Sequence, residues 1–181
     1  MVIQKYNPIW KDNFEKIKIE IQKSLSEIKI QIEHVGSTSV IGLAAKPIID
    51  IDLIYYNDLD FPKIKSGLSE IGYFHNGNQG IPNREVFKRK EIIEKHPVLD
   101  KHKHHLYVCI NESEELKRHL LFRDFLREND SAKKKYEILK FQLAEEANQD
   151  RKKYAELKEI RAKQWIQSII NLAEKEFGKE M

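Results

Sequence analysis

Two aspartates, Asp50 and Asp52, interrupt an otherwise apolar run from residue 48 to residue 55. A short run rich in isoleucine predicts a β-strand that is covered on both faces. Side chains two positions apart on a strand share one face, so the two carboxylates should project side by side. Neighbouring, half-buried carboxylates are costly unless cations or hydrogen-bond donors compensate them.

Two explanations of this pair are open. Mg²⁺ (or Mn²⁺) takes oxygen ligands and is commonly held by one or two carboxylates together with substrate phosphates, so the pair could be a metal site. Alternatively, the strand lies at the margin of the sheet, where the carboxylates are hydrated or paired with a basic side chain. The candidates for such a pairing are Lys46, Arg84 and Lys88.

The residues before the pair favour the metal site. Residues 28–35 alternate isoleucine with polar side chains and predict a strand with one hydrated face, which stops at Gly36. Glycine has no Cβ and allows a tight turn that a ligand can approach closely. Ser37 and Thr38 add hydroxyls and backbone N–H groups that could hold a phosphate. A Gly-Ser-Thr turn alone is weakly specific, but together with the Asp-x-Asp strand it predicts phosphate beside a cation.

The segment 34–51 contains the strings His-Val-Gly-Ser-Thr-Ser-Val and Gly-Leu-Ala-Ala-Lys-Pro-Ile-Ile-Asp-Ile. It closely resembles the GrpB family, which belongs to the nucleotidyltransferase-fold superfamily. Residues 6–10, 104–108, 122–127 and 136–143 resemble further motifs of that family, so the likeness covers nearly the whole chain. It implies an α+β fold: a small mixed β-sheet of the nucleotidyltransferase type, with a helical C-terminal half.

The resemblance also implies a site. Nucleotidyltransferases of this fold place a Gly-Ser turn against a nucleoside triphosphate and use an Asp-x-Asp pair to hold the catalytic divalent metal. Gly36 and Ser37 match the turn, and Asp50 and Asp52 match the pair. The resemblance thus implies a nucleoside triphosphate as ligand and Mg²⁺ (or Mn²⁺) as cofactor.

A third acid, which this fold carries on a neighbouring strand, is not evident here. Residues 104–110 should form that strand, and they offer His105 and Tyr107 on one face. The resemblance implies that His105 faces the carboxylates in place of the acid. Lys46 and Arg123 are further candidates for binding nucleotide phosphates, although a surface position for Lys46 and local ion pairing around Arg123 explain them as well.

Two functions from different classes therefore fit the sequence. The first is metal-dependent nucleotidyl transfer, in which a nucleoside monophosphate moves from a triphosphate to an unknown hydroxyl acceptor. The second is a non-catalytic module of the same fold that binds a nucleotide or a partner protein, and the missing third acid favours it. A fold alone does not decide between them.

Composition limits the range of functions. A chain of 181 residues predicts one domain over residues 1–181. The 32 basic and 29 acidic residues nearly cancel, to a net charge of +3, so nucleic acid is a disfavoured partner. The single cysteine, Cys109, lies in an apolar run and should be a packed thiol in a reducing compartment. No run has transmembrane length and no signal peptide is evident, so we expect a cytoplasmic protein without a membrane partner.

Four histidines gather near the expected strand 104–110: His96, His102, His104 and His105. Histidines two apart on a strand could share a zinc ion. The chain supplies no cysteine partner there and no His-Glu-x-x-His pattern, so zinc is the weaker interpretation of this cluster.

Periodicity and turn residues predict the remaining elements. Ser131 is expected to cap the helix that starts there, and the strand 84–89 is expected at the edge of the sheet. We expect helices over residues 10–27, 60–71, 111–129, 131–144 and 154–177, a strand at 73–75, a polar loop beside the site at 76–83, and a further loop at 90–103.

Overall fold

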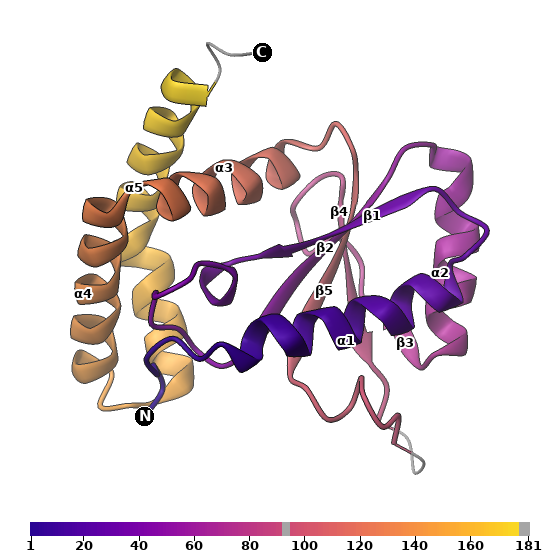
Figure 1. Ribbon diagram of the computed structural model, residues 1–181, viewed down its shortest axis with the longest axis horizontal. Coiled ribbons are helices and arrows are strands. Elements are labelled where there is room, and N and C mark those ends of the chain that lie inside the picture. Colours follow the sequence, from indigo (N-terminus) through magenta and orange to yellow (C-terminus); the bar gives the residue numbers. More distant parts are fainter. Residues whose placement is uncertain (92–94, 178–181) are drawn as a thin grey trace.

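Five β-strands form one mixed sheet in the order β1-β2-β5-β4-β3 (Figure 1). In the computed structural model, which describes residues 1–91 and 95–177, β2 runs parallel to β5 and the other neighbouring pairs are antiparallel. The strands are β1 (Ile30–Val35), β2 (Ile49–Tyr55), β3 (Tyr73–His75), β4 (Arg84–Arg89) and β5 (His104–Ile110).

Helices cover the sheet, and a helical half extends beyond it (Figure 1). The mixed sheet followed by this half confirms the predicted α+β class. Among the described residues, no helix is long and apolar enough to cross a membrane. The helices are α1 (Ile9–Ser24), α2 (Phe61–Glu70), α3 (Glu114–Glu128), α4 (Asp130–Glu146) and α5 (Arg151–Phe177), with the 3₁₀ turns η1 (Ser37–Ser39) and η2 (Asp58–Asp60).

One face of the sheet forms the main apolar core with α1 and α2. Phe14, Ile17 and Ile21 recur on α1 at three- and four-residue steps, and all three are buried. They belong to the same cluster as Ile51 of β2 and Leu106 of β5. Full burial of side chains of this size stabilises the fold by roughly 1.5–3 kcal/mol each.

The opposite face carries the two aspartates. Across the parallel β2–β5 ladder, Asp50 is paired with His105 and Asp52 with Tyr107. Directly paired residues point to the same side of a sheet, so these four side chains share one face. Helix α3 contributes His119 to that face, where its ring contacts Asp52. The predicted arrangement of a strand covered on both sides, with both aspartates on one face, is thus confirmed.

Two local expectations were wrong. Strand β4 is not at the sheet edge, because it pairs with β5 on one side and with β3 on the other. The three-residue β3 takes the edge instead, and alternation within a strand carries no information about its neighbours. Helix α4 is capped by Asn129, whose side-chain oxygen accepts the N–H of Ala132 at 2.9 Å, and not by Ser131. Part of the expected loop 90–103, residues 92–94, lies outside the described residues.

Two histidines lie on the α1 side of the sheet: His34 is buried and His104 is partly buried. The ring of His34 stacks on Phe14 with a centroid separation of 4.7 Å, and its Nε2 lies 2.9 Å from Thr38 Oγ1. His104 lies between the Tyr73 hydroxyl and the carbonyl oxygen of His102. Burial lowers the pKa of both imidazoles to about 4, so both are neutral in the folded protein at neutral pH.

Acid should therefore weaken the fold through these two rings. Because the pKa is lowered on folding, the unfolded chain binds more protons between about pH 6.5 and pH 4, and stability is lost as the pH falls through that window. We expect a loss on the order of 1–3 kcal/mol. In His34→Gln the free energy of unfolding, measured by urea titration at several pH values, should fall less steeply than in the wild type. Parallel curves for the two proteins would contradict this assignment.

Candidate functional site

The Gly36 turn lies directly against the carboxylate of Asp50. Gly36 has a φ of +68°, and its carbonyl oxygen accepts the Ser39 hydroxyl at 2.6 Å. A Cβ at this position would overlap Asp50 Oδ2 and lie 3.0 Å from Asp50 Cβ. Both the left-handed backbone and the close approach require glycine here. The turn predicted from the sequence exists, and its backbone at Gly36 contacts Asp50, one of the two aspartates.

Asp50 forms a dyad with His105. Asp50 Oδ1 lies 2.9 Å from His105 Nδ1, and the side chain of His105 is 53% exposed, against 31% for Asp50. A neutral imidazole that donates from Nδ1 to a carboxylate keeps Nε2 as a proton acceptor. The pair can therefore receive a proton from a bound molecule while the carboxylate holds the ring in place.

Asp52, two residues along the strand, is fully buried. Its Oδ2 lies 2.8 Å from His119 Nδ1, and His119 Nε2 lies 3.3 Å from Glu115 Oε1 on the same helix. Only a protonated imidazole donates from both nitrogens. Burial opposes the charged ring, but the hydrogen bonds to Asp52 and Glu115 raise the pKa of His119 to about 10. The imidazolium thus compensates the buried carboxylate, whose own pKa is raised by burial.

One carboxylate oxygen of Asp52 accepts no hydrogen bond from the described residues. This oxygen, Oδ1, is buried. A cation held jointly with Asp50 would satisfy this oxygen, so the pair fits a divalent ion as two of its ligands. Within residues 1–91 and 95–177, however, no three His, Cys, Asp or Glu side chains are grouped to hold a metal. Because His119 bridges Asp52 and Glu115, Glu115 does not provide the third acid.

A cavity of about 540 Å³ lies over this face of the sheet. The glycine turn, Asp50 and His105 border it on one side, and residues of α3, α4 and α5 border it on the other. Among the charged side chains that line the cavity, cationic ones are more numerous than acidic ones. They are Lys46, Arg84, Arg118, Lys140, Lys158 and Lys163.

Two of these lysines, Lys140 and Lys158, have pKa values shifted by their surroundings. Lys140 is only 1% exposed; its Nζ donates to the carbonyl oxygen of Ala44 and lies 4.5 Å from the centre of the Tyr136 ring. Burial, and then Lys158, lower the pKa of Lys140 well below its usual value, whereas Tyr136 raises that of Lys158. Burial and Lys158 also lower the pKa of Lys46. After burial, the charge of Lys158 is thus the next cause that disfavours the charged forms of Lys140 and Lys46.

Aromatic side chains border the same cavity. Phe122 and Tyr136 line it, and Trp165 stacks on Tyr136 with a centroid separation of 4.9 Å. Phe122 meets Tyr136 edge to face at 5.4 Å. Tyr136 is almost fully buried, with Trp165 stacked on it and Lys140 Nζ close to its ring, so Phe122 is the partly exposed ring of this pair.

Most of the residues predicted from the sequence meet at this cavity. Its lining includes Gly36, Ser37, Thr38, Lys46, Asp50 and His105. Asp52 is two residues from Asp50 on the same face of β2. The Thr38 hydroxyl contacts His34 and the carbonyl oxygen of Ile48, at 2.9 and 3.4 Å, so it is already engaged within the protein.

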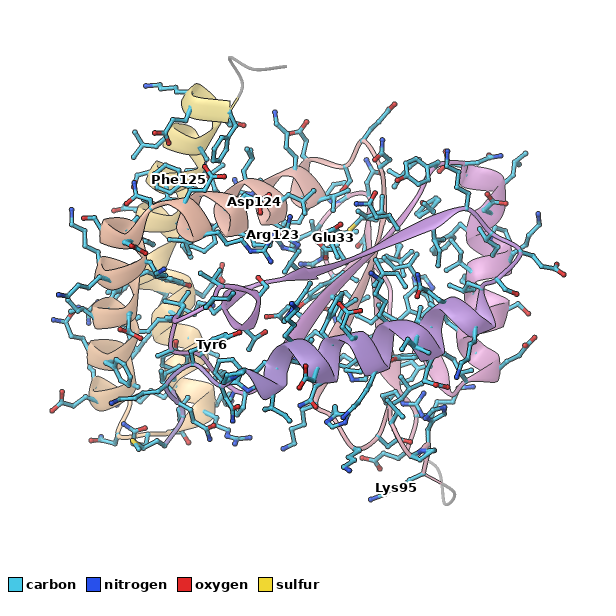
Figure 2. All side chains as sticks on the ribbon, in the orientation of Figure 1. Tyr6, Glu33, Lys95, Arg123, Asp124 and Phe125 are labelled. Carbon is cyan, nitrogen blue, oxygen red and sulfur yellow. The ribbon has the colours of Figure 1, made fainter. Side chains whose placement is uncertain are left out.

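Arg123 is placed elsewhere. Its guanidinium donates to Glu33 at 2.5 Å, to Asp124 at 2.7 Å and to the carbonyl oxygen of His34 at 3.2 Å (Figure 2). It borders a separate hollow beside α1 and not the cavity over Asp50. The structure therefore uses this arginine to join α3 to β1, and ion pairing within the protein describes it better than phosphate binding.

Histidines, and not lysine or arginine, are the partners of the two aspartates. His105 contacts Asp50 and His119 contacts Asp52. The pairing expected for a strand at the sheet margin therefore does not form. Its candidates were Lys46, Arg84 and Lys88.

The four-histidine cluster near β5 does not assemble. His96 Nδ1 faces backbone N–H groups, and His104 and His105 turn to opposite faces of the sheet. Cys109 in the same strand is buried, and burial raises its thiol pKa to about 12. The prediction of a packed thiol is confirmed.

The sequence analysis missed His119, Glu115 and the lysines of the two last helices. A signal for the lysines exists: Lys140 follows Tyr136 by four residues, and Lys158 follows Tyr154 by four. Positions four apart share a helix face, so each lysine lies on an apolar stripe where a solvated side chain is unexpected. No comparable signal marks His119, because its partner Asp52 is 67 residues away.

The sequence of this chain is similar to those of known proteins. The sequence matches the family described as "GrpB protein" over residues 1–171. The glutamate-rich protein GrpB of Alkalihalophilus pseudofirmus is 33% identical over 172 residues, which cover 94% of each chain. The UPF0157 protein YqkA of Bacillus subtilis is 34% identical over 140 residues, and the match spans 77% of this chain but only 38% of that longer relative.

Solved structures agree with this family assignment. The conserved protein GrpB from Enterococcus faecalis superposes with a TM-score of 0.78 at 32% identity, over 97% of this chain and 99% of that chain. Cid1 in complex with its short product ApU matches at a TM-score of 0.53 and 13% identity, over 78% of this chain and 42% of Cid1. The H336N mutant of the Cid1 poly(U) polymerase, bound to MgATP, matches at a TM-score of 0.55 and 11% identity, over 80% of this chain and 45% of that chain. At such low identities the likeness to Cid1 shows the fold, which is the predicted nucleotidyltransferase-like fold.

The contact between Gly36 and Asp50 predicts a position-specific cost of adding a methyl group. Gly42 also has a positive φ, of +81°, but a Cβ there meets nothing within 4 Å. Gly42→Ala should lose roughly 1 kcal/mol of unfolding free energy through its backbone alone. Gly36→Ala should lose about 1–3 kcal/mol more, because it also overlaps Asp50. Denaturant titration of both variants measures the difference, and equal losses would contradict the close approach.

Removal of the His119 imidazolium should leave the buried Asp52 carboxylate without a charged partner. We expect His119→Leu to lower the unfolding free energy by on the order of 3–5 kcal/mol, the cost of leaving one buried charge without its partner. Asp52→Asn/His119→Leu, which removes the charge as well, should recover part of that loss. Additive effects of the two substitutions in a double-mutant cycle would show that the two side chains do not depend on each other.

Proposed function

The chain belongs to the GrpB family, and on that premise we propose that it is a metal-dependent nucleotidyltransferase, which moves a nucleoside monophosphate from a triphosphate to a hydroxyl acceptor. One observation carries the proposal: the accessible carboxylate of Asp50 lies between the Gly36 turn and a cavity of about 540 Å³ with six cationic side chains. A polyphosphate with its cation matches that distribution of charge, and a neutral substrate does not.

The lining residues suggest how the nucleotide is held. Backbone N–H groups of the turn at Gly36 and Ser37 would receive phosphate oxygens. Lys158 and Lys163, from the helical wall, would compensate the negative charge of the triphosphate tail. The aromatic side of the cavity, at Phe122, would then accept the base.

Asp50 and Asp52 would hold the divalent cation, with Asp52 Oδ1 as the oxygen that lacks another partner. When bound, Mg²⁺ or Mn²⁺ neutralises phosphate oxygens as charge develops on the transferring group. The chain's own side chains supply the remaining contacts.

In the chemical step, the acceptor hydroxyl oxygen forms a bond to the α-phosphorus. The bond from that phosphorus to the bridging oxygen breaks, and pyrophosphate leaves with the electron pair. His105 Nε2 receives the hydroxyl proton, while Asp50 fixes the ring through Nδ1 at 2.9 Å. The cavity lysines meet the charge on the leaving pyrophosphate.

A second candidate is supported by a separate observation. His119 occupies the space between Asp52 and Glu115, and within the described parts of the chain no third acid joins the pair. A site of this kind can bind a nucleotide and its cation without turning it over. The non-catalytic module is thus the function that an assay must separate from the transferase.

MgATP at about five times Kd should stabilise the folded state by about 1 kcal/mol, because it binds only that state. For a chain of this length the melting temperature of the wild type should rise by about 2–4 °C. Asp50→Asn/Asp52→Asn should show no such rise, and Lys158→Ala a smaller one. Lys152→Ala is the matched control, because Lys152 lies on the same helix but is exposed and outside the cavity lining. Equal shifts in the wild type and the double aspartate variant would reject the cation and nucleotide site.

Release of pyrophosphate from labelled triphosphates, assayed with a library of hydroxyl compounds, separates the two candidates. In the transferase, His105→Ala should lower turnover by about 10²- to 10⁴-fold and keep the thermal shift. A full thermal shift with no turnover of any triphosphate would favour the binding module.

A further inference from the structure

We infer that the acceptor enters from a second hollow on the other side of His105, and that this hollow takes a small hydroxyl compound that carries a phosphate, such as a sugar phosphate. The inference rests on the proposed nucleotidyl transfer and adds to it the class of the acceptor.

The hollow has a volume of about 320 Å³ and lies where the chain enters β2 and β5. Its lining includes Arg89, His102 and Lys103. His105 and Ile48 line both this hollow and the larger cavity, so the two spaces meet at these side chains. A hydroxyl group at this junction could face the α-phosphorus of a triphosphate in the cavity, while Nε2 of His105, to one side, takes its proton.

The exposure of His105 suits this position. Its Nδ1 is bound to Asp50, and its side chain is 53% exposed. Among the described residues, no hydrogen bond engages Nε2, so this nitrogen is available to a hydroxyl group from either side. The backbone beside it is fixed, because the Ile49 N–H donates to the carbonyl oxygen of Lys103 at 3.0 Å.

The charges of the hollow select an anion. Arg89 and Asp100 bind each other through two hydrogen bonds, of 2.7 and 2.9 Å, and their charges cancel. Lys103 remains as a cation that is exposed and forms no ion pair within the described part of the chain. A single lysine at the mouth of the hollow suits one phosphate group as a point charge.

The size of the hollow favours a small molecule. A volume of about 320 Å³ is at the lower end of the range for ligand sites, which suits a sugar phosphate. Polymeric nucleic acid would need a charged surface that continues beyond the site, and the chain as a whole carries a net charge of only +3. We therefore assign the small acceptor and treat an RNA end as an outcome of the test.

The test is an NMR titration of the histidine Cε1–H signals with ribose 5-phosphate, at fixed pH, with and without a non-hydrolysable MgATP analogue. We expect saturable shifts of His102 and His105, and none of His34, which is buried in the core. Lys103→Glu should weaken ribose 5-phosphate binding by at least about tenfold. Lys101→Glu, which changes a nearby exposed lysine outside the hollow, should leave it unchanged.

Four outcomes would overturn the inference: no saturable shift at His102, binding that is equal in Lys103→Glu and the wild type, equally tight binding of inorganic phosphate, or saturation only by a short oligoribonucleotide. The first two reject the site, the third rejects recognition of the hydroxyl compound, and the fourth assigns the hollow to an RNA end. The MgATP thermal shift is measured without ribose 5-phosphate. Its loss alongside an intact titration would reject nucleotidyl transfer and leave a sugar-phosphate site.

Discussion

A carboxylate without solvent exposure, Asp52, is the constraint on which the site depends. It is tolerated because His119 of α3 supplies an imidazolium at 2.8 Å, and Glu115 in turn holds the far side of that ring. The contact joins the sheet to the helical half of the protein, so it also determines where the cavity between them opens. Since an unpaired buried charge costs several kcal/mol, the position of α3 over β2 is strongly specified.

The second constraint is steric and lies at the turn that follows β1. Gly36 leaves no room for a side chain beside Asp50, and its positive φ turns the chain sharply into η1. Asp50 is thereby held between backbone and His105 but stays partly exposed. Two aspartates of the same strand thus have different environments: Asp52 is buried with one oxygen on His119, and Asp50 is partly exposed.

The helical half contributes most of the charged side chains around the cavity: four cations and the acids Glu115 and Glu159. The sheet side adds Asp50, Lys46 and Arg84. Lys140 and Lys158 extend from α4 and α5 toward the face that carries Asp50, and burial lowers the pKa of Lys140. Lys158 also lowers the pKa of both Lys140 and Lys46, so these three lysines lie close enough to influence one another. His105 lines both this cavity and the smaller hollow beside Lys103, so the two spaces meet at its ring.

The sequence by itself determined the elements and the local geometry: the strand that carries Asp50 and Asp52 on one face, the turn at Gly36, and the family resemblance that predicted the fold. These follow from periodicity and turn chemistry, which depend on residues a few positions apart. Only the tertiary structure decided that β4 is an inner strand, that Arg123 joins α3 to β1, and that His119 meets Asp52. Such contacts link distant segments, and strand pairing and helix packing leave no local pattern that would reveal them.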